Sequence, residues 1–321
     1  MRRTFLITLV FSMLLVFSAC RKESGHTLSP GIQRQVALLP ADADVLGFLD
    51  IQAVQNSPFF DFITDSLQAE LNEDEDFKTL TDELGLDPQK DIQRMYLAAR
   101  FKNEDNLNIL LVIEGNFQPD KILAKIEKEA DSDSFKKTAY DKYKIYLFPE
   151  DKAFAFTDNR HIIAGTVQWV KLYLKNVSGS APALNPEIKK RLKKLPYINQ
   201  AWLLAEIGQW TKKIKQDDTH PRLKGLSSLK QFDFAMELNG ELRFFSQGIF
   251  DDEEKCQLFH DALKGLIAAG KLAVSDDRSV VDILNKITIR NRGKDLDINF
   301  EISRDDLQKL LNRKKSWATK I

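Results

Sequence analysis

The residues that most often do chemistry in proteins are few and scattered in this chain of 321 residues. Its histidines are His26, His161, His220 and His260, and none has a second histidine, a cysteine or an acid at zinc-site spacing. The sequence also lacks a glycine-rich phosphate loop, the Gly-x-Ser-x-Gly elbow of serine hydrolases and a dinucleotide-binding fingerprint. We therefore expect structural histidines, no catalytic residues, no cofactor and a protein that is not an enzyme.

Two carboxylates, Asp50 and Glu206, are the strongest remaining candidates for acid–base chemistry. Each ends a short apolar run and is followed by isoleucine, and two acids held close together can share acid–base work. The alternative, which we favour, is that each caps the helix after its strand, because helix starts favour Asp and negative charge. The run 131–133 opens like a calcium loop, but Phe135 occupies the third ligand position and the central glycine is missing. No metal site is expected.

Cys20 closes an N-terminal segment with the features of an export signal. A positive start, Arg2-Arg3, is followed by an apolar run over 5–17 and then by Ser18-Ala19-Cys20. Together these features resemble the lipobox signal of bacterial lipoproteins, although Phe17 stands where that family prefers leucine. In that family the cysteine thiol is acylated, the chain is cut before it, and the new N-terminus is acylated too. The resemblance implies a signal peptide over 1–19 and lipid attachment at Cys20.

Two alternatives to the lipid anchor are an ordinary signal peptide with a chance cysteine and a retained transmembrane helix. The apolar run is short for a helix that crosses a bilayer. Several acyl chains on Cys20 would hold the chain firmly to membrane lipid, whereas one chain binds only reversibly. Lys22, rather than aspartate, follows the cysteine by two residues. By analogy with lipoprotein sorting, this favours the outer membrane, facing the periplasm in a Gram-negative envelope.

The second cysteine, Cys256, lies in an amphipathic helical pattern. With Cys20 acylated it has no partner for an internal disulfide, so packing must stabilise this exported protein. We expect Cys256 to be a small buried hydrophobic residue rather than a catalytic thiol.

Two segments of the chain repeat. Residues 39–51 align without gaps on 195–207: in both, Leu-Pro leads into an apolar run that ends in a carboxylate and isoleucine. Residues 110–117 likewise match 243–250, and each run ends in Gly-x-Phe. Since the two matches come in the same order, they predict an internal duplication.

Apolar runs, turn residues and capping signals predict a similar order of elements in both halves. The expected strands are 45–50, 91–101, 107–115, 143–148, 153–157 and 161–165, then 201–206, 231–238, 242–249, 286–290 and 296–302. The main expected helices are 53–71, 77–84, one from Pro119, 167–175, 186–194, 209–216, 251–272 and 304–312. The turn Asn239-Gly240 is the strongest hairpin signal.

This pattern predicts an α+β fold of two similar units, each an antiparallel-rich sheet with helices packed on one face. Residues 20–35 are polar and contain Gly25, Pro30 and Gly31, so they predict a flexible lipidated tether. The expected domains are 36–176 and 186–321, joined by a Ser-, Gly- and Pro-containing linker over 177–185.

One further resemblance rests on Leu39-Pro40-Ala41-Asp42-Ala43, which leads into a strand, a helix and Ser57-Pro58-Phe59. This segment resembles a family of uncharacterised bacterial proteins, often exported and built from two similar halves. The likeness is strongest over 37–60. It implies no catalytic residues.

The formal net charge of zero conceals an asymmetry along the chain. Residues 41–91 include fourteen acidic residues and two lysines, whereas residues 185–230 include eleven basic residues and four acidic ones. Solvated helix faces are the simpler reading; the alternative is that the two halves, or two copies, meet with complementary fields. The basic helix 188–195 could likewise rest on anionic head groups or cover its own sheet. Nucleic acid is not expected as a partner.

These observations favour a membrane-anchored envelope lipoprotein with a non-enzymatic binding or structural role and an envelope protein as partner. The first alternative is a carrier or chaperone of a lipid or other hydrophobic ligand, which needs an apolar cavity. The second is a hydrolase with a scattered site, which needs His161 or His260 to meet carboxylates in a deep pocket.

Overall fold

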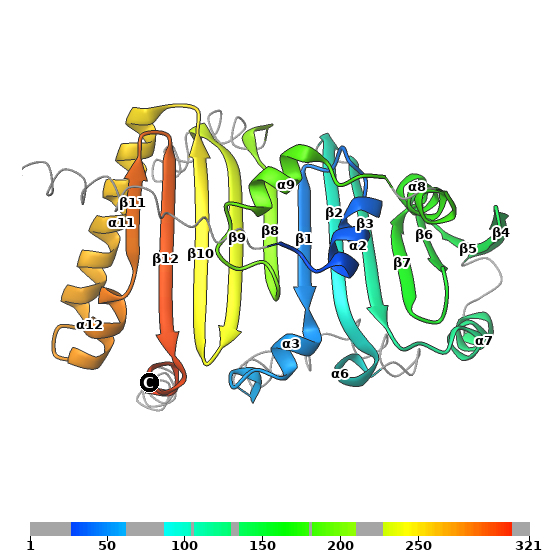
Figure 1. The fold of residues 1–321 in the computed structure, drawn as a ribbon, viewed down its shortest axis with the longest axis horizontal. Helices are drawn as coiled ribbons and strands as arrows, with labels where there is room; N and C mark the ends of the chain where they lie inside the picture. Colours follow the sequence, from blue (N-terminus) through cyan, green and yellow to red (C-terminus); the bar gives the residue numbers. More distant parts are fainter. Residues whose placement is uncertain are drawn as a thin grey trace, which may run out of the picture.

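The computed structural model describes residues 27–61, 87–103, 106–129, 135–179, 182–209 and 227–309. Their strands form one antiparallel sheet of twelve strands in the order β11-β12-β10-β9-β8-β1-β2-β3-β7-β6-β5-β4 (Figure 1). The first half supplies β1 (Val45–Asp50), β2 (Ile92–Asn103), β3 (Asn106–Gly115), β4 (Lys136–Tyr140), β5 (Tyr143–Phe148), β6 (Lys152–Phe156) and β7 (His161–Thr166). The second half supplies β8 (Ala201–Glu206), β9 (Leu229–Asn239), β10 (Glu241–Phe250), β11 (Thr288–Arg292) and β12 (Asp295–Ser303). The predicted α+β class with an antiparallel sheet is confirmed.

The two halves meet through their first strands, because β1 pairs with β8 in the middle of the sheet. Gly47 lies opposite Leu203, Leu46 opposite Leu204, and Phe48 opposite Trp202. The gap-free alignment of the halves places Gly47 on Leu203. The pairing is therefore symmetric about the Gly47–Leu203 pair, as a local two-fold axis through the sheet requires.

The second sequence match also falls on equivalent strands. Residues 110–115 end β3, and 243–248 lie in β10, each the third strand of its half. Each of these strands pairs with the last strand of its own half, β7 and β12 respectively. The duplication predicted from sequence thus corresponds to two similar strand orders that share one sheet.

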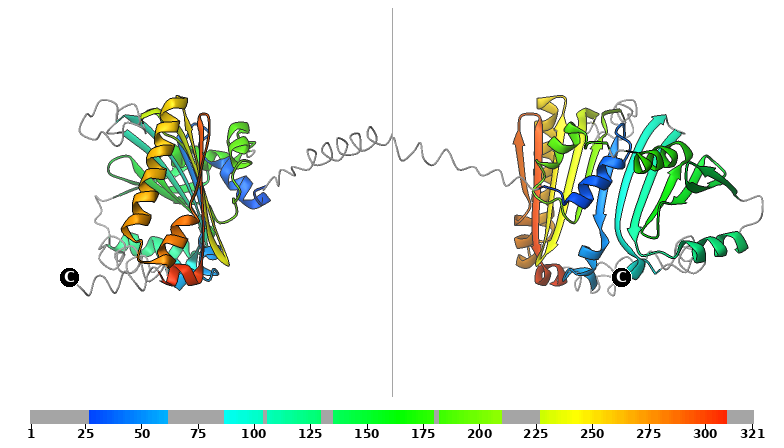
Figure 2. Two further views of the ribbon diagram at one scale, coloured as in Figure 1. Left: turned by 90° about the vertical axis from the view of Figure 1, so that its left-hand side faces the viewer. Right: turned by 45° about the vertical axis from the view of Figure 1, so that its right-hand side comes forward.

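Helices cover both faces of this sheet rather than one, as the edge-on view in Figure 2 shows. On one side, which we call the α8 face, lie α2 (Pro30–Leu38), α8 (Val167–Ser178) and α9 (Pro186–Leu192). On the other side, the α11 face, lie α11 (Glu253–Ala273) and α12 (Arg278–Asn285). Short helices α3 (Ile51–Gln55) and α6 (Pro88–Asp91) flank strands, and α7 (Pro119–Glu129) follows β3 as α11 follows β10.

The main hydrophobic core lies on the α8 face and crosses the junction between the halves. The Phe48 ring lies between Tyr96 and Trp202, with ring centroids 5.3 Å and 5.9 Å apart. These three side chains come from β2, β1 and β8, and all are at most 3 % exposed. The ranges 36–176 and 186–321 therefore share both a sheet and a core.

Helix α2 corrects the expectation that residues up to 35 form a flexible tether. Pro30 occupies the first helical turn, where the missing N–H costs no hydrogen bond. Ile32 and Val36, one turn apart, are buried in the core with Leu38. The Pro-Gly pair therefore marks a helix start that is packed on the α8 face.

Other elements differ from the expectations in identifiable ways. The helix predicted over 53–71 is interrupted near Pro58, because α3 ends at Gln55, a turn follows, and residues 60 and 61 are helical again. Residues 62–71 of that prediction lie outside the described residues. Strand β4 and helix α12 were not predicted. The Asn239-Gly240 hairpin is confirmed, with Gly240 at φ +76°. The predicted helix 77–84 lies wholly outside the described residues, and the predicted helix 209–216 lies outside them except for Gln209.

Candidate functional site

Asp50 and Glu206 occupy equivalent positions in the sequence repeat, but they lie apart in the structure. Because β1 and β8 are antiparallel, Asp50 and Glu206 lie at opposite ends of the central pair. The rise of a strand puts these ends about 17 Å apart. A shared acid–base role for Asp50 and Glu206 is therefore wrong.

Asp50 caps the helix after its strand, as predicted. Its Oδ1 accepts a hydrogen bond of 2.8 Å from the backbone N–H of Ala53 in α3. Its Oδ2 accepts a second, of 3.0 Å, from Nε of Arg94 on β2. Glu206 instead accepts hydrogen bonds from Nη1 of Arg191 at 2.7 Å and from the Gln231 side chain.

Arg94 belongs to a half-buried ionic cluster on the α8 face. Its Nη1 lies 3.3 Å from Oε1 of Glu114, and Nη2 of Arg160 lies 3.3 Å from the same oxygen. The hydroxyl of Tyr96 donates to Oε2 of Glu114 at 3.2 Å. Burial, followed by the charge of Glu114, raises the pKa of Tyr96. Each carboxylate in this cluster faces a guanidinium, an arrangement that holds strands together.

His161 lies beside a carboxylate within a chain of hydrogen bonds that runs from Asp158 through His161 and Gln35 to Tyr173. We call this chain the relay. Its Nδ1 lies 2.9 Å from Asp158 Oδ1, and its Nε2 lies 2.9 Å from Nε2 of Gln35 on α2. Gln35 Oε1 accepts a hydrogen bond of 2.6 Å from the Tyr173 hydroxyl on α8. The amide of Gln35 must then donate to Nε2, which assigns the proton of a neutral His161 to Nδ1. Both ring nitrogens are occupied, and the relay docks α2 on the sheet.

The other candidate residues within the described ranges, His260 and Cys256, have surroundings typical of structural rather than catalytic residues. The His260 Nδ1 lies 2.9 Å from the exposed carboxylate of the neighbouring Asp261 on α11. Cys256 is fully buried, and burial together with Asp295 and Glu253 raises the pKa of its thiol. A buried thiol with a raised pKa is a poor nucleophile. Cys20, His26 and His220 lie outside the described residues, so the structure does not test them.

The basic helix predicted over 188–195 is α9, and one of its cations points inward. Arg191 pairs with Asp233 on β9, a carboxylate that is 1 % exposed, through Nε at 3.2 Å and through Nη2. Its Nη2 also donates to the backbone oxygen of Ala205. Lys190, by contrast, is exposed and pairs with the exposed Glu187. The helix covers its own sheet on the α8 face.

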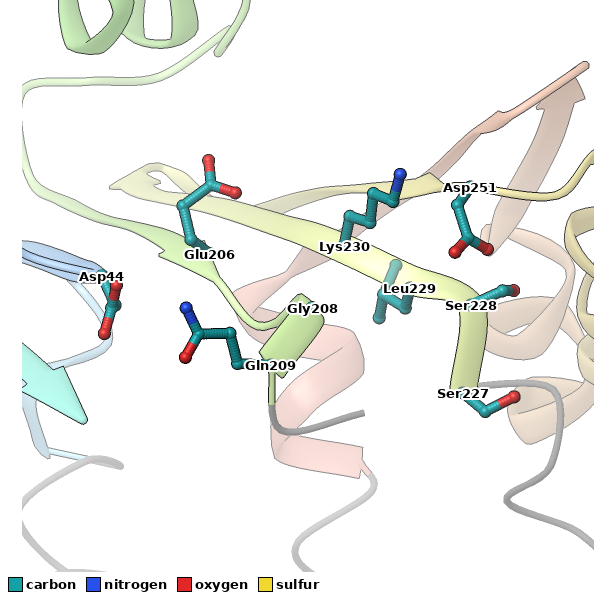
Figure 3. A pocket seen from close by; sticks show the side chains of 9 residues that line it. All are labelled: Asp44, Glu206, Gly208, Gln209, Ser227, Ser228, Leu229, Lys230 and Asp251. Atoms are coloured by element: carbon teal, nitrogen blue, oxygen red, sulfur yellow. The ribbon is translucent and has the colours of Figure 1, made fainter. Parts of the chain in front are cut away.

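Two cavities lie at the end of the sheet where β1 begins and β8 ends. The larger, about 260 Å³, is drawn in Figure 3 and is lined by Asp44, Glu206, Gly208, Gln209, Ser227, Ser228, Leu229, Lys230 and Asp251. In Figure 3 the Gln209 side chain points toward Asp44, whereas Glu206 and Lys230 project to the same side. The second, about 220 Å³, lies under α9 and shares Asp44 and Glu206. This is the candidate functional site, an opening lined by charged groups.

The chemical capacity of this opening is limited by the bonds its groups already make. Asp44 accepts a hydrogen bond from the backbone of Phe101, and Glu206 is paired with Arg191. Within the described ranges no three His, Cys, Asp or Glu residues are grouped as metal ligands. Two of its lining residues, Gln209 and Ser227, are the last and first described residues on either side of a gap in the described ranges. We therefore assign no ligand to it.

An apolar cavity was the requirement of the lipid-carrier alternative. One cavity with a mostly apolar lining lies between the start of α2 and α9, and it measures about 40 Å³. Ligand pockets typically measure about 300–1,000 Å³. Among all the residues that the structure describes, no helix combines the length and apolar character needed to cross a membrane.

Sequence comparison missed the ionic cluster and the relay. For the cluster, the available signal was a charged residue on the inward side of an apolar strand, namely Arg94 in β2 and Glu114 in β3. Asp233 in β9, the partner of Arg191, gives the same signal. Such residues need a buried partner of opposite charge. Which partners they find depends on strand pairing that single-strand patterns do not reveal.

The fold resembles that of TP0453. Its crystal form III matches with a TM-score of 0.51 and 12 % sequence identity, over 86 % of this chain and 96 % of that one. Crystal form IV matches with a TM-score of 0.47 and 13 % identity, over 86 % and 95 % of the two chains. At this identity the likeness concerns the fold alone. No protein-family model and no curated protein matches the chain.

Proposed function

We propose that this chain is a lipid-anchored protein of the bacterial cell envelope whose role is binding or structural rather than catalytic. The observation that carries the proposal is the run Ser18-Ala19-Cys20 after a positive start and a short apolar segment. Acylation of Cys20 would tie the folded body to membrane lipid. The outer membrane, facing the periplasm, is the proposed location if the cell is Gram-negative.

The start of α2 supports a body held close to that membrane. Nine residues, 21–29, separate Cys20 from Pro30, the first residue of α2. Even fully extended, these residues reach about 30 Å. Because α2 is packed on the α8 face, the lipid would be tied to a fixed point on the sheet. A protein partner would then meet the body near the membrane surface.

The absence of catalysis is proposed from the bonding of the polar groups. His161 has both ring nitrogens occupied, and the carboxylates of the ionic cluster face guanidinium groups. Neither arrangement leaves a general base next to a nucleophile, which acyl transfer requires. Activity-based probes for reactive serine and cysteine should therefore leave the purified chain unlabelled. Labelling that disappears in a His161→Ala variant would contradict this.

The anchor is tested by metabolic labelling with an alkyne analogue of palmitate. We expect label on the wild-type chain and on a Cys256→Ala control, and none on Cys20→Ala. Wild type should stay with the membrane fraction after a high-salt wash, whereas exported Cys20→Ala should be released. Label that persists on Cys20→Ala, or a wild-type chain without label, would overturn the anchor.

A further inference from the structure

The hydrogen bonds of the relay have a fixed direction. The ionised carboxylate of Asp158 can only accept, so Nδ1 of His161, 2.9 Å away, carries a proton. In a neutral ring Nε2 then has a lone pair, which accepts from the Gln35 amide at 2.9 Å. Oε1 of the same amide accepts from the Tyr173 hydroxyl at 2.6 Å. Every donor in the relay therefore meets an acceptor while His161 is neutral.

The two ends of the relay keep their protonation states at neutral and mildly acid pH. Burial opposes the charge of Asp158, but hydrogen bonds from the Arg160 backbone and from His161 outweigh it and lower the pKa of the carboxyl. Burial raises the pKa of Tyr173, so its hydroxyl retains its proton. Histidine is the side chain that ordinarily changes charge between about pH 5 and pH 8. A proton added to the relay in this range therefore goes to Nε2 of His161.

The ionisable groups around His161 come mainly from the sheet rather than from α2. Those that face the ring or its relay partners are Asp158 and Arg160 before β7, Glu114 on β3, Arg94 and Tyr96 on β2, Tyr143 on β5 and Tyr173 on α8. Arg34, the one charged residue in the sequence of α2, is exposed. A charge on His161 therefore meets α2 through the amide of Gln35.

A proton on Nε2 of His161 sets two donors against each other. The protonated nitrogen donates, as does the amide nitrogen of Gln35, so the bond between them is lost. The amide can turn over and present Oε1 to the ring, but the Tyr173 hydroxyl then loses the acceptor of its proton. Tyr173 is 1 % exposed, so water does not replace that acceptor. Either arrangement leaves a donor unpaired in a poorly solvated site, which is unfavourable.

We propose that protonation of His161 releases α2 from the α8 face of the sheet. Ile32 and Val36 pack in the core and hold the helix in its ground state. The proton therefore changes how often α2 opens and leaves the sheet folded, as expected of a local opening. Opening exposes the apolar surface beneath α2 to solvent. The proposal holds whether or not Cys20 carries lipid.

The release is tested by hydrogen exchange of the full-length chain at about pH 8 and about pH 5. Protection of each amide is taken relative to an unstructured peptide at the same pH. Protection in α2 should fall by at least about fivefold at the lower pH, whereas β1 should be unchanged. Constant protection in α2, or equal losses in α2 and β1, would overturn the proposal.

Nitrogen NMR of the wild-type ring links this change to His161. The proton should lie on Nδ1 alone at the higher pH, and the loss of protection in α2 should follow the appearance of the second ring proton. A change in α2 at a pH where the charge of His161 stays constant would overturn the proposal. Since this measurement needs no substitution, it applies even where a variant fails to fold.

Two substitutions in the relay test the conflict between donors. Gln35→Glu supplies a carboxylate that accepts from Tyr173 and from a protonated His161, so protection in α2 should rise as the pH falls. Tyr173→Phe removes the hydroxyl and lets the amide turn over without leaving a donor unpaired. The response of α2 to pH should then shrink to less than about twofold. A Gln35→Glu chain that responds like wild type would overturn the proposal.

His161→Gln and His260→Gln form a matched pair. Both histidines lie 2.9 Å from an aspartate through Nδ1, but His260 lies on α11, across the sheet from α2. His161→Gln has no titrating ring, so protection in α2 should be the same at both pH values. His260→Gln should keep the wild-type response. A response that persists in His161→Gln, or one that disappears in His260→Gln, would overturn the proposal.

Discussion

Gly47 and Leu203 face each other across the central strand pair, and each is the residue that sequence alignment places on the other. This relationship makes the chain a pseudo-symmetric pair of halves fused along one strand from each. On either side of it the core continues without a break, through Phe48, Tyr96 and Trp202. The predictions below follow from this arrangement.

The shared core predicts that damage at the junction is felt in both halves. Phe48→Ala should lower the free energy of unfolding by about 3–5 kcal/mol, because Phe48 is 3 % exposed and packs on Tyr96 and Trp202. Hydrogen exchange should show reduced protection in β10 as well as β3. Reduced protection confined to the first half would indicate two independent units. Leu107→Ala, at an exposed site, serves as the control.

Arg191, the inward-pointing cation of α9, should contribute far more to stability than its exposed neighbour Lys190. Arg191→Met leaves Asp233 buried without its cation and should cost about 3–5 kcal/mol of stability. Lys190→Met removes an exposed pair with Glu187 and should change stability by less than about 1 kcal/mol. Chemical denaturation of the two variants measures the difference. Equal effects would show that the Arg191–Asp233 pair does not stabilise the fold.

The relay through Gln35 predicts that α2 can be loosened without disrupting the sheet. Gln35→Leu removes the bonds to His161 and Tyr173 and should cost about 1–3 kcal/mol. Hydrogen exchange should accelerate in α2 and remain slow in β1. Arg34→Ala, at the exposed neighbouring position, should leave exchange in α2 unchanged. Simultaneous loss of protection in α2 and β1 would mean that the helix does not open separately.

Asp306, which follows the end of β12, predicts that the stability of the fold depends on pH in the acid range. Hydrogen bonds from Lys286, Ser303 and Lys309 lower the pKa of Asp306 to about 2. A lowered folded-state pKa stabilises the fold above the ordinary aspartate pKa, and this stabilisation disappears as pH falls toward the folded-state pKa. The stability difference between wild type and Asp306→Asn should therefore shrink between about pH 4 and pH 2.

Carboxyl NMR titration checks the same group directly. In Lys286→Met the pKa of Asp306 should rise toward its ordinary value, because the largest of the three bonds is lost. An unchanged titration in that variant would assign the shift to Ser303 and Lys309 instead.

Much of the fold could be predicted where burial leaves a strong local pattern. The strands 45–50, 143–148 and 201–206 have the predicted bounds, because each is a compact apolar run. Strand β4 was missed because its residues are mostly exposed and leave no alternating pattern. Helix α2 was missed because Pro30-Gly31 resembles a linker signal when the burial of Ile32 and Val36 is unknown.

The polar contacts of Asp50, Arg94 and Glu206 were less predictable, because they join distant segments. The position of Asp50 suggested a helix cap, and the structure shows one. Nothing within β2 or β3 indicates that Arg94 would lie between Asp50 and Glu114, since strand neighbours are set by the whole sheet. The opposite placement of Asp50 and Glu206 likewise follows from one antiparallel pairing.

The central pairing also has a consequence for the order in which the chain is made. Residues 45–49 must wait for residues 201–205, which emerge 156 positions later. Closing a loop of that length costs on the order of 4–5 kcal/mol of chain entropy. Until then, β1 presents a free backbone edge, and exposed edges invite pairing with other chains. The outer edge strands carry Lys136 and Lys137 on β4, and Arg290 and Arg292 on β11, as safeguards. The run Val45–Leu49 has no charge. A nascent or truncated first half is therefore the most aggregation-prone form of this protein, and synthesis of β8 ends that exposure.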